Sequence, residues 1–180
     1  RQECANGITQ GGVAGLDVKF LSGVCRGRFA ADGHLYVCGL NGWQTAAQAD
    51  GCLQRVRYTG KPFDVPVKMV VDGDAIRLTF SRALDAKAAA DAANYKAAWW
   101  NYRWSADYGS ERWKVSDPKA TGQDEFAPNA AKLLVNGKTV ELAFAKLRPV
   151  MQMQVGYNLK AADGKPVAAS VFLTIHTTGK

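Results

Sequence analysis

The chain has 180 residues, 47% of them hydrophobic and 22% charged, and its net charge is +7 at neutral pH. That length allows one domain or two small ones with a real hydrophobic core. No apolar stretch approaches the roughly 18 residues that a membrane-spanning helix needs, which excludes a helical membrane span. The lysines and arginines are scattered, with no run of five or six like charges, so the basic balance does not indicate a nucleic-acid partner.

The N-terminal third of the chain is set apart by its cysteines, which all lie within the first 52 residues: Cys4, Cys25, Cys38 and Cys52. Two disulfides are one interpretation, and three connectivities are then open. A four-residue hairpin loop at residues 30–33 would place Cys25 opposite Cys38. The alternative is that the thiols pack as small hydrophobic side chains. Without a Cys-x-x-Cys pair a zinc site is not expected, and the absence of Cys-x-x-Cys-His excludes an attached c-type haem.

Residues 1–62 predict a small sheet of short antiparallel strands. Alternating side-chain types favour three strands, at residues 24–29, 34–39 and 53–58. The first two are joined through Asp32-Gly33, a pair that favours positive φ, and Trp43 anchors a loop before the third. Pro62 and Pro66 bracket a linker, so we place the domain boundary at residue 62.

Residues 63–180 predict an immunoglobulin-like β-sandwich. Short alternating segments separated by turn residues favour strands at residues 67–71, 75–80, 132–135, 138–144, 151–157 and 171–175. About seven strands with closely spaced turns are typical of such sandwiches. The one segment that favours a helix is the alanine-rich stretch at residues 83–93. The predicted fold class is therefore all-β.

A long aromatic insert, at about residues 99–128, interrupts this sandwich. Its run Trp99-Trp100-Asn101-Tyr102-Arg103-Trp104 is too rich in large rings, and too polar between them, for an ordinary core strand. In one interpretation the rings fix the insert to the rest of the protein. In the other they form a ligand platform that stacks on sugar rings, and its candidate residues are Trp100, Tyr102, Arg103, Trp104, Asp107, Tyr108 and Trp113.

The signals for catalysis are weak. His34 lies beside a tight turn and His176 in the last predicted strand, where solvent-facing or ordinary strand positions are expected. There is neither a Gly-x-Ser-x-Gly elbow nor a phosphate-binding loop. A glycosidase needs a pair of carboxylates, and the insert has five acidic residues. We interpret them instead as solvated side chains or a weak calcium site: Asp107, Glu111, Asp117, Asp124 and Glu125. We therefore expect no catalytic, cofactor or metal site in this chain.

Several motifs resemble the C-terminal region of exported β-propeller proteins related to sugar or sorbosone dehydrogenases, of planctomycete and verrucomicrobial type and often fused to cytochrome c. The last propeller blade is matched by residues 25–29, 32–37, 42–45 and 54–60, the last of these reading Gln-Arg-Val-Arg-Tyr-Thr-Gly. The domain that follows is matched by residues 78–81, 100–104, 108–110, 147–153 and 157–159. Together these stretches cover most of the chain.

The resemblance implies a noncatalytic accessory segment that closes or positions a larger parent protein. Quinone- or haem-linked chemistry would lie in the parent's other blades and cytochromes, since one blade cannot enclose a propeller's channel. It also implies a periplasmic or secreted location, which suits disulfides. The start at Arg1, without a methionine or signal peptide, leads us to expect a piece of a longer product. The alternative function is a carbohydrate-binding module with a polysaccharide partner.

Overall fold

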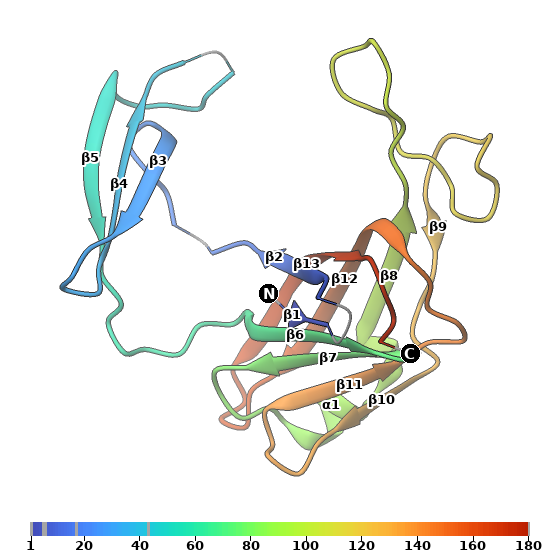
Figure 1. Ribbon diagram of the computed structural model, residues 1–180. Helices are drawn as coiled ribbons and strands as arrows, with labels where there is room; N and C mark the ends of the chain where they lie inside the picture. Colours follow the sequence, from blue (N-terminus) through green and yellow to red (C-terminus); the bar gives the residue numbers. More distant parts are fainter. Residues whose placement is uncertain (1, 5–6, 17, 43, 180) are drawn as a thin grey trace. The chain divides into compact units, whose positions relative to one another are not determined.

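The computed structural model describes residues 2–4, 7–16, 18–42 and 44–179, and 47% of the chain is strand against 5% helix (Figure 1). The predicted all-β, sandwich-like class is confirmed. The chain divides into two compact units, a larger one of Arg1–Gly15 and Phe63–Lys180 and a smaller one of Leu16–Pro62. Trp43, the predicted loop anchor, lies outside the described residues. No helix in the described part of the chain is long and apolar enough to span a membrane.

Two antiparallel sheets form the larger unit. The six-stranded sheet has the order β1-β2-β13-β12-β8-β9, with bounds Gln2–Glu3, Thr9–Ala14, Pro166–Ile175, Val150–Lys160, Tyr95–Trp100 and Asp124–Glu125. The four-stranded sheet has the order β10-β11-β7-β6, with bounds Ala130–Leu133, Thr139–Ala143, Ala75–Phe80 and Pro66–Asp72. Alternating burial along β7 and β13 directs every second side chain into one hydrophobic core.

The predicted helix at residues 83–93 is shorter than expected and divided. An α-helix, α1, spans Ala86–Ala90, and a 3₁₀ turn, η1, spans Ala92–Asn94. The Asp85 carboxylate accepts a hydrogen bond from the Ala88 N–H at 2.7 Å and caps α1. Asp91 has an extended backbone and caps the 3₁₀ turn in the same way. Two capping aspartates therefore divide a stretch whose alanines alone favour one continuous helix.

The N-terminal fifteen residues belong to the larger unit, so the predicted head of residues 1–62 starts too early. Strand β2 pairs with β13, with Gly12 opposite Leu173. A Cβ added to Gly12 would lie 2.4 Å from the Phe172 carbonyl oxygen, so glycine is required for this close approach. From the sequence, the Gly-Gly pair at residues 11 and 12 suggests a loop. In the structure, the absence of a side chain at Gly12 allows β2 to pair closely with β13.

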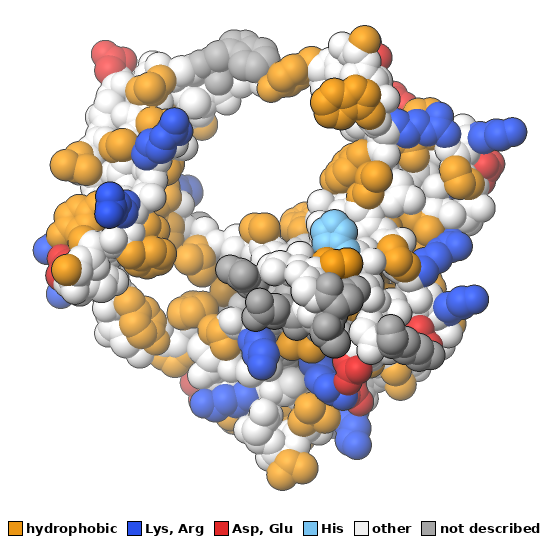
Figure 2. Space-filling model, viewed as in Figure 1, with side chains coloured by type: hydrophobic (Ala, Val, Ile, Leu, Met, Phe, Trp, Pro, Cys, Tyr) orange, Lys and Arg blue, Asp and Glu red, His pale blue; other side chains and the backbone are white. Residues whose placement is uncertain are grey.

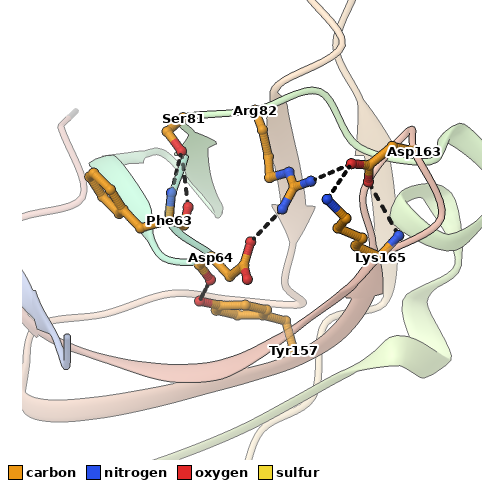
Figure 3. A network of polar contacts seen from close by, with 7 residues as sticks. All are labelled: Phe63, Asp64, Ser81, Arg82, Tyr157, Asp163 and Lys165. Atoms are coloured by element: carbon orange, nitrogen blue, oxygen red, sulfur yellow. Dashed lines mark hydrogen bonds and ion pairs between the residues drawn. The ribbon is translucent and has the colours of Figure 1, made fainter. Parts of the chain in front are cut away.

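A network of polar contacts fixes the chain where it enters β6 (Figure 3). The Tyr157 hydroxyl donates to the Asp64 carbonyl oxygen at 2.9 Å. The Arg82 guanidinium pairs with the Asp64 carboxylate at 3.0 Å and with Asp163 at 2.8 Å. These contacts begin directly after Pro62, which coincides with the boundary placed there from the sequence.

The smaller unit is a three-stranded antiparallel sheet in which β3, β4 and β5 span Gly23–Phe29, Leu35–Leu40 and Gly51–Val56. The Ala30 N–H donates to the His34 carbonyl oxygen at 3.0 Å, so the β3–β4 loop has three residues, not four. This changes the register by one residue and places Arg26 opposite Cys38. The expected alignment of Cys25 with Cys38 is therefore wrong, because Cys25 lies at a bulge.

All four cysteines are free thiols in this structure. Cys4 belongs to the larger unit, and the other three lie in the smaller one. The Cys25 thiol lies 3.6 Å from the Cys38 carbonyl oxygen, and both side chains are exposed. Cys52 is half-buried, with the Ser22 hydroxyl 2.8 Å from its sulfur. Neither expectation for the cysteines, disulfides or buried thiols, describes Cys25 and Cys38 here.

Candidate functional site

The aromatic run begins inside a core strand. Trp99 and Trp100 end β8 and are only 5% and 2% exposed. The Trp99 ring stacks on Phe126 with centroids 3.9 Å apart, within the hydrophobic core. Trp100 points to the opposite face of the sheet, as successive strand residues do. The expectation that this run avoids a core strand is wrong for these two residues, because the insert covers the outer face above Trp100.

Three arginines lie over tryptophan rings at this end of the sandwich. The distances from guanidinium carbon to ring centroid are 3.5 Å for Arg103 over Trp113, 4.1 Å for Arg112 over Trp100 and 5.4 Å for Arg148 over Trp99. Such cation–π contacts contribute about 0.5 to 2 kcal/mol each, depending on how far they exclude water. Since Arg112 comes from the insert, its contact holds the insert against β8.

The buried Trp100 indole N–H has no hydrogen-bond partner in the described structure. The Arg112 guanidinium lies over the ring and donates to the Gln123 side-chain oxygen, which joins the middle of the insert to its second half. Trp100 was a candidate platform residue, and this assignment is wrong, because a ring that is 2% exposed cannot stack on a ligand. Its role is to fix the insert.

A carboxylate organises the second half of the insert. Asp124 accepts hydrogen bonds from the Ser116 hydroxyl at 2.6 Å, the Ser116 N–H at 2.8 Å and the Val115 N–H at 2.7 Å. Burial raises the pKa of Asp124, but these bonds and the charge of Lys114 outweigh it and leave the pKa below its usual value. Asp124 therefore holds a turn in its ionised form.

The tip of the insert carries fully exposed rings. Trp104 is 102% exposed and Tyr108 is 94% exposed. They border a hollow of about 690 Å³, which we call the tip hollow. The tip hollow is lined by Arg103, Trp104, Ser105, Asp107, Tyr108, Gly109, Ser110, Glu111 and Trp113. Large apolar faces beside carboxylates and hydroxyls are a combination that can stack on a sugar ring and bond its hydroxyl groups.

A second hollow, of about 500 Å³, lies where the insert leaves the sandwich, and we call it the basal hollow. It is lined by Asn101, Tyr102, Arg103, Trp113, Lys114, Pro118, Pro149, Val150, Met151, Thr174, Ile175 and His176. The starts and ends of β8, β12 and β13 meet there with the insert. Arg103 and Trp113 line both hollows, so the two are neighbours.

The other proposed platform residues divide between the two hollows. Tyr102 is 39% exposed, lines the basal hollow and donates its hydroxyl to the Gln152 side-chain oxygen at 3.2 Å. Trp113 is half-buried under Arg103. Asp107 is exposed and borders the tip hollow. Lys114, which also lines the basal hollow, was not predicted as a site residue. Its position directly after Trp113 is the one sequence feature that could have indicated it.

The acidic residues of the insert have separate roles. Asp107 and Glu111 line the tip hollow, whereas Asp117 accepts the Lys119 N–H at 3.0 Å and Asp124 caps its turn. Glu125 pairs in β9 with β8. Within the described residues, no group of three or more histidines, cysteines or carboxylates is arranged to hold a metal ion.

The two histidines lie in different units. The His34 backbone N–H donates to the Asp32 carboxylate at 2.9 Å, in the tight turn of the smaller unit. His176 is exposed, follows β13 directly and lines the basal hollow, and its N–H donates to the Gln10 side-chain oxygen at 3.0 Å. Sequence reasoning treated His176 as an ordinary strand residue, and only the fold brings it near the insert.

The smaller unit exposes large hydrophobic side chains on both faces of its sheet. Side chains of paired residues share a face, which puts Val24 and Phe29 on one face and Leu40 and Leu53 on the other. Phe29 is 73% exposed and Leu53 is 77% exposed. Figure 2 shows hydrophobic side chains gathered over β3, β4 and β5. In the described part of this unit, Val37 is the one buried hydrophobic residue.

These observations give two candidate sites: the exposed faces of the β3–β5 sheet and the pair of hollows on the insert. Each consists of side chains whose exposure is unusual for their chemistry. No family model, no curated protein and no solved structure matches the chain, so its function has to be argued from these residues.

Proposed function

We propose that this chain is a noncatalytic structural segment of a larger exported protein, of the dehydrogenase-like β-propeller type that its motifs resemble. In this proposal the β3–β5 sheet packs between neighbouring sheets of that protein, and the sandwich closes or positions the assembly. Any quinone- or haem-linked chemistry would then belong to the remainder of the parent.

The observation that carries the proposal is the exposure of hydrophobic side chains on both faces of β3–β5. A sheet that packs against a core on one side has one apolar face. A propeller blade packs against a neighbouring blade on each side and therefore has two apolar faces. Phe29 on one face and Leu53 on the other are each about three-quarters exposed. Large apolar side chains gathered at a surface are typical of interaction sites.

The composition of the smaller unit supports the same conclusion. Eight of its large hydrophobic residues are exposed: Leu16, Val18, Leu21, Val24, Phe29, Leu40, Leu53 and Tyr58. Three short strands gain stability from packing against a further surface. The face of the sheet that carries Leu53 also carries three arginines, Arg26, Arg28 and Arg55. The surface that packs on this face should therefore be partly acidic, or rich in carbonyl groups at its edge.

A photo-crosslinking experiment tests this proposal. A benzophenone amino acid is placed at Phe29, at Leu53 or at Val135, which is 108% exposed in the turn between β10 and β11 and serves as the matched control. In cells that make the natural protein, Phe29 and Leu53 should each crosslink to a propeller-type sheet, identified from the joined peptides, and Val135 should not. Absence of crosslinks from both faces of β3–β5 would contradict the proposal.

The second candidate function is carbohydrate binding at the tip hollow. It is favoured by the full exposure of Trp104 and Tyr108 beside Asp107 and Glu111. Affinity electrophoresis through a panel of polysaccharides, with Trp104→Ala and with Leu53→Ala as an exposed control, tests it. Retardation that Trp104→Ala abolishes and Leu53→Ala leaves intact is the expected result. Equal migration of all three proteins on every polysaccharide would exclude it.

A further inference from the structure

We propose that the basal hollow binds the carboxylate group of an acidic sugar, while the tip hollow receives the neighbouring sugar unit of the same polysaccharide. This inference rests on the second candidate function, sugar binding by the insert, and specifies its substrate class. The acidic sugar would be a uronate, whose carboxylate lies on a ring that otherwise carries hydroxyl groups.

The charge of the basal hollow is the first argument. Its lining includes Arg103, Lys114 and His176 and no carboxylate side chain. Across the described residues, neither Arg103 nor Lys114 has a carboxylate within 4.0 Å, the distance of an ion pair. The charge of Lys114 contributes to the lowered pKa of Asp124, but that carboxylate already accepts hydrogen bonds from Ser116 and Val115. A cavity with unpaired cations favours an anion.

The geometry of Arg103 is the second argument. Its guanidinium lies 3.5 Å from the Trp113 ring centroid and donates one N–H to the Pro118 carbonyl oxygen. Both contacts hold the planar group in one orientation before any ligand arrives. A guanidinium has five N–H donors, so several remain for a carboxylate, which it can bond through two parallel hydrogen bonds.

The arrangement of the two hollows favours a sugar polymer over a nucleic acid. Arg103 and Trp113 line both hollows, so a ligand in one extends directly into the other. The tip hollow presents Asp107 and Glu111, which accept hydrogen bonds from hydroxyl groups but repel a second anion. A nucleic acid carries a phosphate at every unit. A polysaccharide in which a uronate lies beside a neutral sugar places its charge on one ring and leaves only hydroxyl groups on the next.

The volumes fit a ligand of this size. The basal hollow holds about 500 Å³ and the tip hollow about 690 Å³, both within the range of about 300 to 1,000 Å³ that small-molecule sites occupy. Tyr102 and Trp113 supply apolar ring surface in the basal hollow, and Asn101 supplies an amide. The exposed Trp104 ring supplies the stacking surface in the tip hollow. One sugar ring in each hollow therefore has both a stacking partner and polar partners.

The test is affinity electrophoresis of the full chain in polygalacturonate with half of its carboxylates methyl-esterified, so that charged units lie beside neutral ones, and in the fully methyl-esterified form, which has the same backbone without the charge. We expect the half-esterified polygalacturonate to bind about tenfold or more tightly. Lys114→Gln should remove most of this preference, since a tenfold preference corresponds to about 1.4 kcal/mol, which one hydrogen bond between charged groups can supply. Lys138→Gln, an equal charge change at an exposed turn, should leave the preference within twofold. Single-stranded DNA measures binding to any polyanion.

A second readout does not depend on net charge. Galacturonate should shift the Trp113 indole N–H signal in the NMR spectrum of the wild-type protein, and galactose should shift it much less. Circular dichroism of Lys114→Gln verifies that the variant is folded. If that variant is unfolded, Arg103→Lys, which keeps the charge but removes the paired donors of the guanidinium, serves in its place and should weaken polygalacturonate binding without affecting DNA.

The outcomes separate the inference from the function on which it rests. If both polymers bind equally, or if Lys114→Gln and Lys138→Gln behave alike, the carboxylate site is wrong and sugar binding stands. If DNA binds as tightly as polygalacturonate, the preference is one for any polyanion, and the inference is overturned. If neither polymer binds, the sugar-binding function fails together with it.

Discussion

The two units of this protein use similar residues with opposite results. Among its described residues, the larger unit buries 25 hydrophobic residues in one core between two sheets. The smaller unit has alternating strands as well, yet Val37 is the one hydrophobic side chain that is fully buried in its described part. Alternation produces a strand in either case, but only a second layer converts one face of a sheet into a core. The difference follows from the architecture, because the described part of the smaller unit is a single three-stranded sheet with no second layer of its own.

Matched leucine substitutions provide the strongest test of this difference. Leu142 in β11 is 0% exposed, and Leu142→Ala should lower the free energy of unfolding of the larger unit by about 2 to 5 kcal/mol, since it removes buried methyl groups and leaves a cavity. Urea denaturation followed by circular dichroism measures the loss. Hydrogen exchange of β7 and β11 peptides assigns it to the larger unit. A loss below about 1 kcal/mol would contradict the layered core.

The capping carboxylate of the insert gives the next largest effect. Asp124→Asn should destabilise the larger unit by about 1 to 3 kcal/mol at pH 7, because hydrogen bonds to an ionised acceptor are weakened. The pH dependence of this effect follows from the pKa of Asp124, which is lowered in the folded state.

The contribution of Asp124 to stability is therefore present above its unfolded-state pKa of about 3.9 and is lost as pH falls through the folded-state pKa. Urea denaturation between pH 2 and pH 7 should show a flatter profile for the variant. Asp107→Asn, at an exposed position of the same insert, is the control, and an equal effect there would contradict this account.

Paired tyrosine substitutions compare the two units directly. Tyr157→Phe removes the part-buried bond to the Asp64 carbonyl oxygen and should cost about 0.5 to 1.5 kcal/mol. Tyr36→Phe removes an exposed bond to Asp32 at 3.0 Å in the smaller unit and should cost less. Thermal unfolding followed by circular dichroism measures both. If the order is reversed, the polar network at the entrance to β6 does not stabilise the larger unit as described.

The same network predicts a dependence on alkaline pH. Burial, with a contribution from Asp64, raises the pKa of Tyr157 to about 12. The unfolded-state value is about 10, so the contribution of Tyr157 is complete below pH 10 and is lost as pH rises toward 12. Wild-type protein should therefore lose stability over this range more steeply than Tyr157→Phe. Identical slopes in alkaline urea titrations would show that the hydroxyl is accessible.

The smallest effect is expected at Leu53 in β5, which is 77% exposed. Leu53→Ala should change the free energy of unfolding of the isolated chain by less than about 0.5 kcal/mol. Hydrogen exchange of β4 and β5 peptides measures the loss of stability in the smaller unit. This loss can be compared directly with the one that Leu142→Ala causes in the larger unit. A loss above 1 kcal/mol would mean that this face is already covered within the chain, and the proposed docking of β3–β5 would lose its basis.

Several elements were predictable because their signals are local. The pair Asp72-Gly73 and the pair Asn136-Gly137 mark turns in the sequence, and Gly73 and Gly137 have positive φ in the structure. The strands on either side follow from alternation. By contrast, β2 was missed, since its Gly-Gly pair suggests a loop unless the neighbouring Phe172 carbonyl is known.

The candidate site was predictable only in part. The ring-rich insert is evident in the sequence, and Trp104, Tyr108 and Asp107 all line the tip hollow. Trp100 was assigned wrongly, because burial on the outer face depends on Arg112, a residue of the insert that folds back over it. His176 and Met151 of the basal hollow are distant from the insert in sequence, and no local pattern associates them with it.

The sequence by itself determined the all-β class, the turns, the boundary at residue 62 and the concentration of aromatic rings in one insert, because each of these depends on neighbouring residues. Only the tertiary structure decided which tryptophans are buried, where the cations of the basal hollow meet, and that residues 11–14 pair with the last long strand, β13. Burial and charge pairing are sums over residues far apart in the chain. They are fixed when the two sheets pack and the insert folds onto β8.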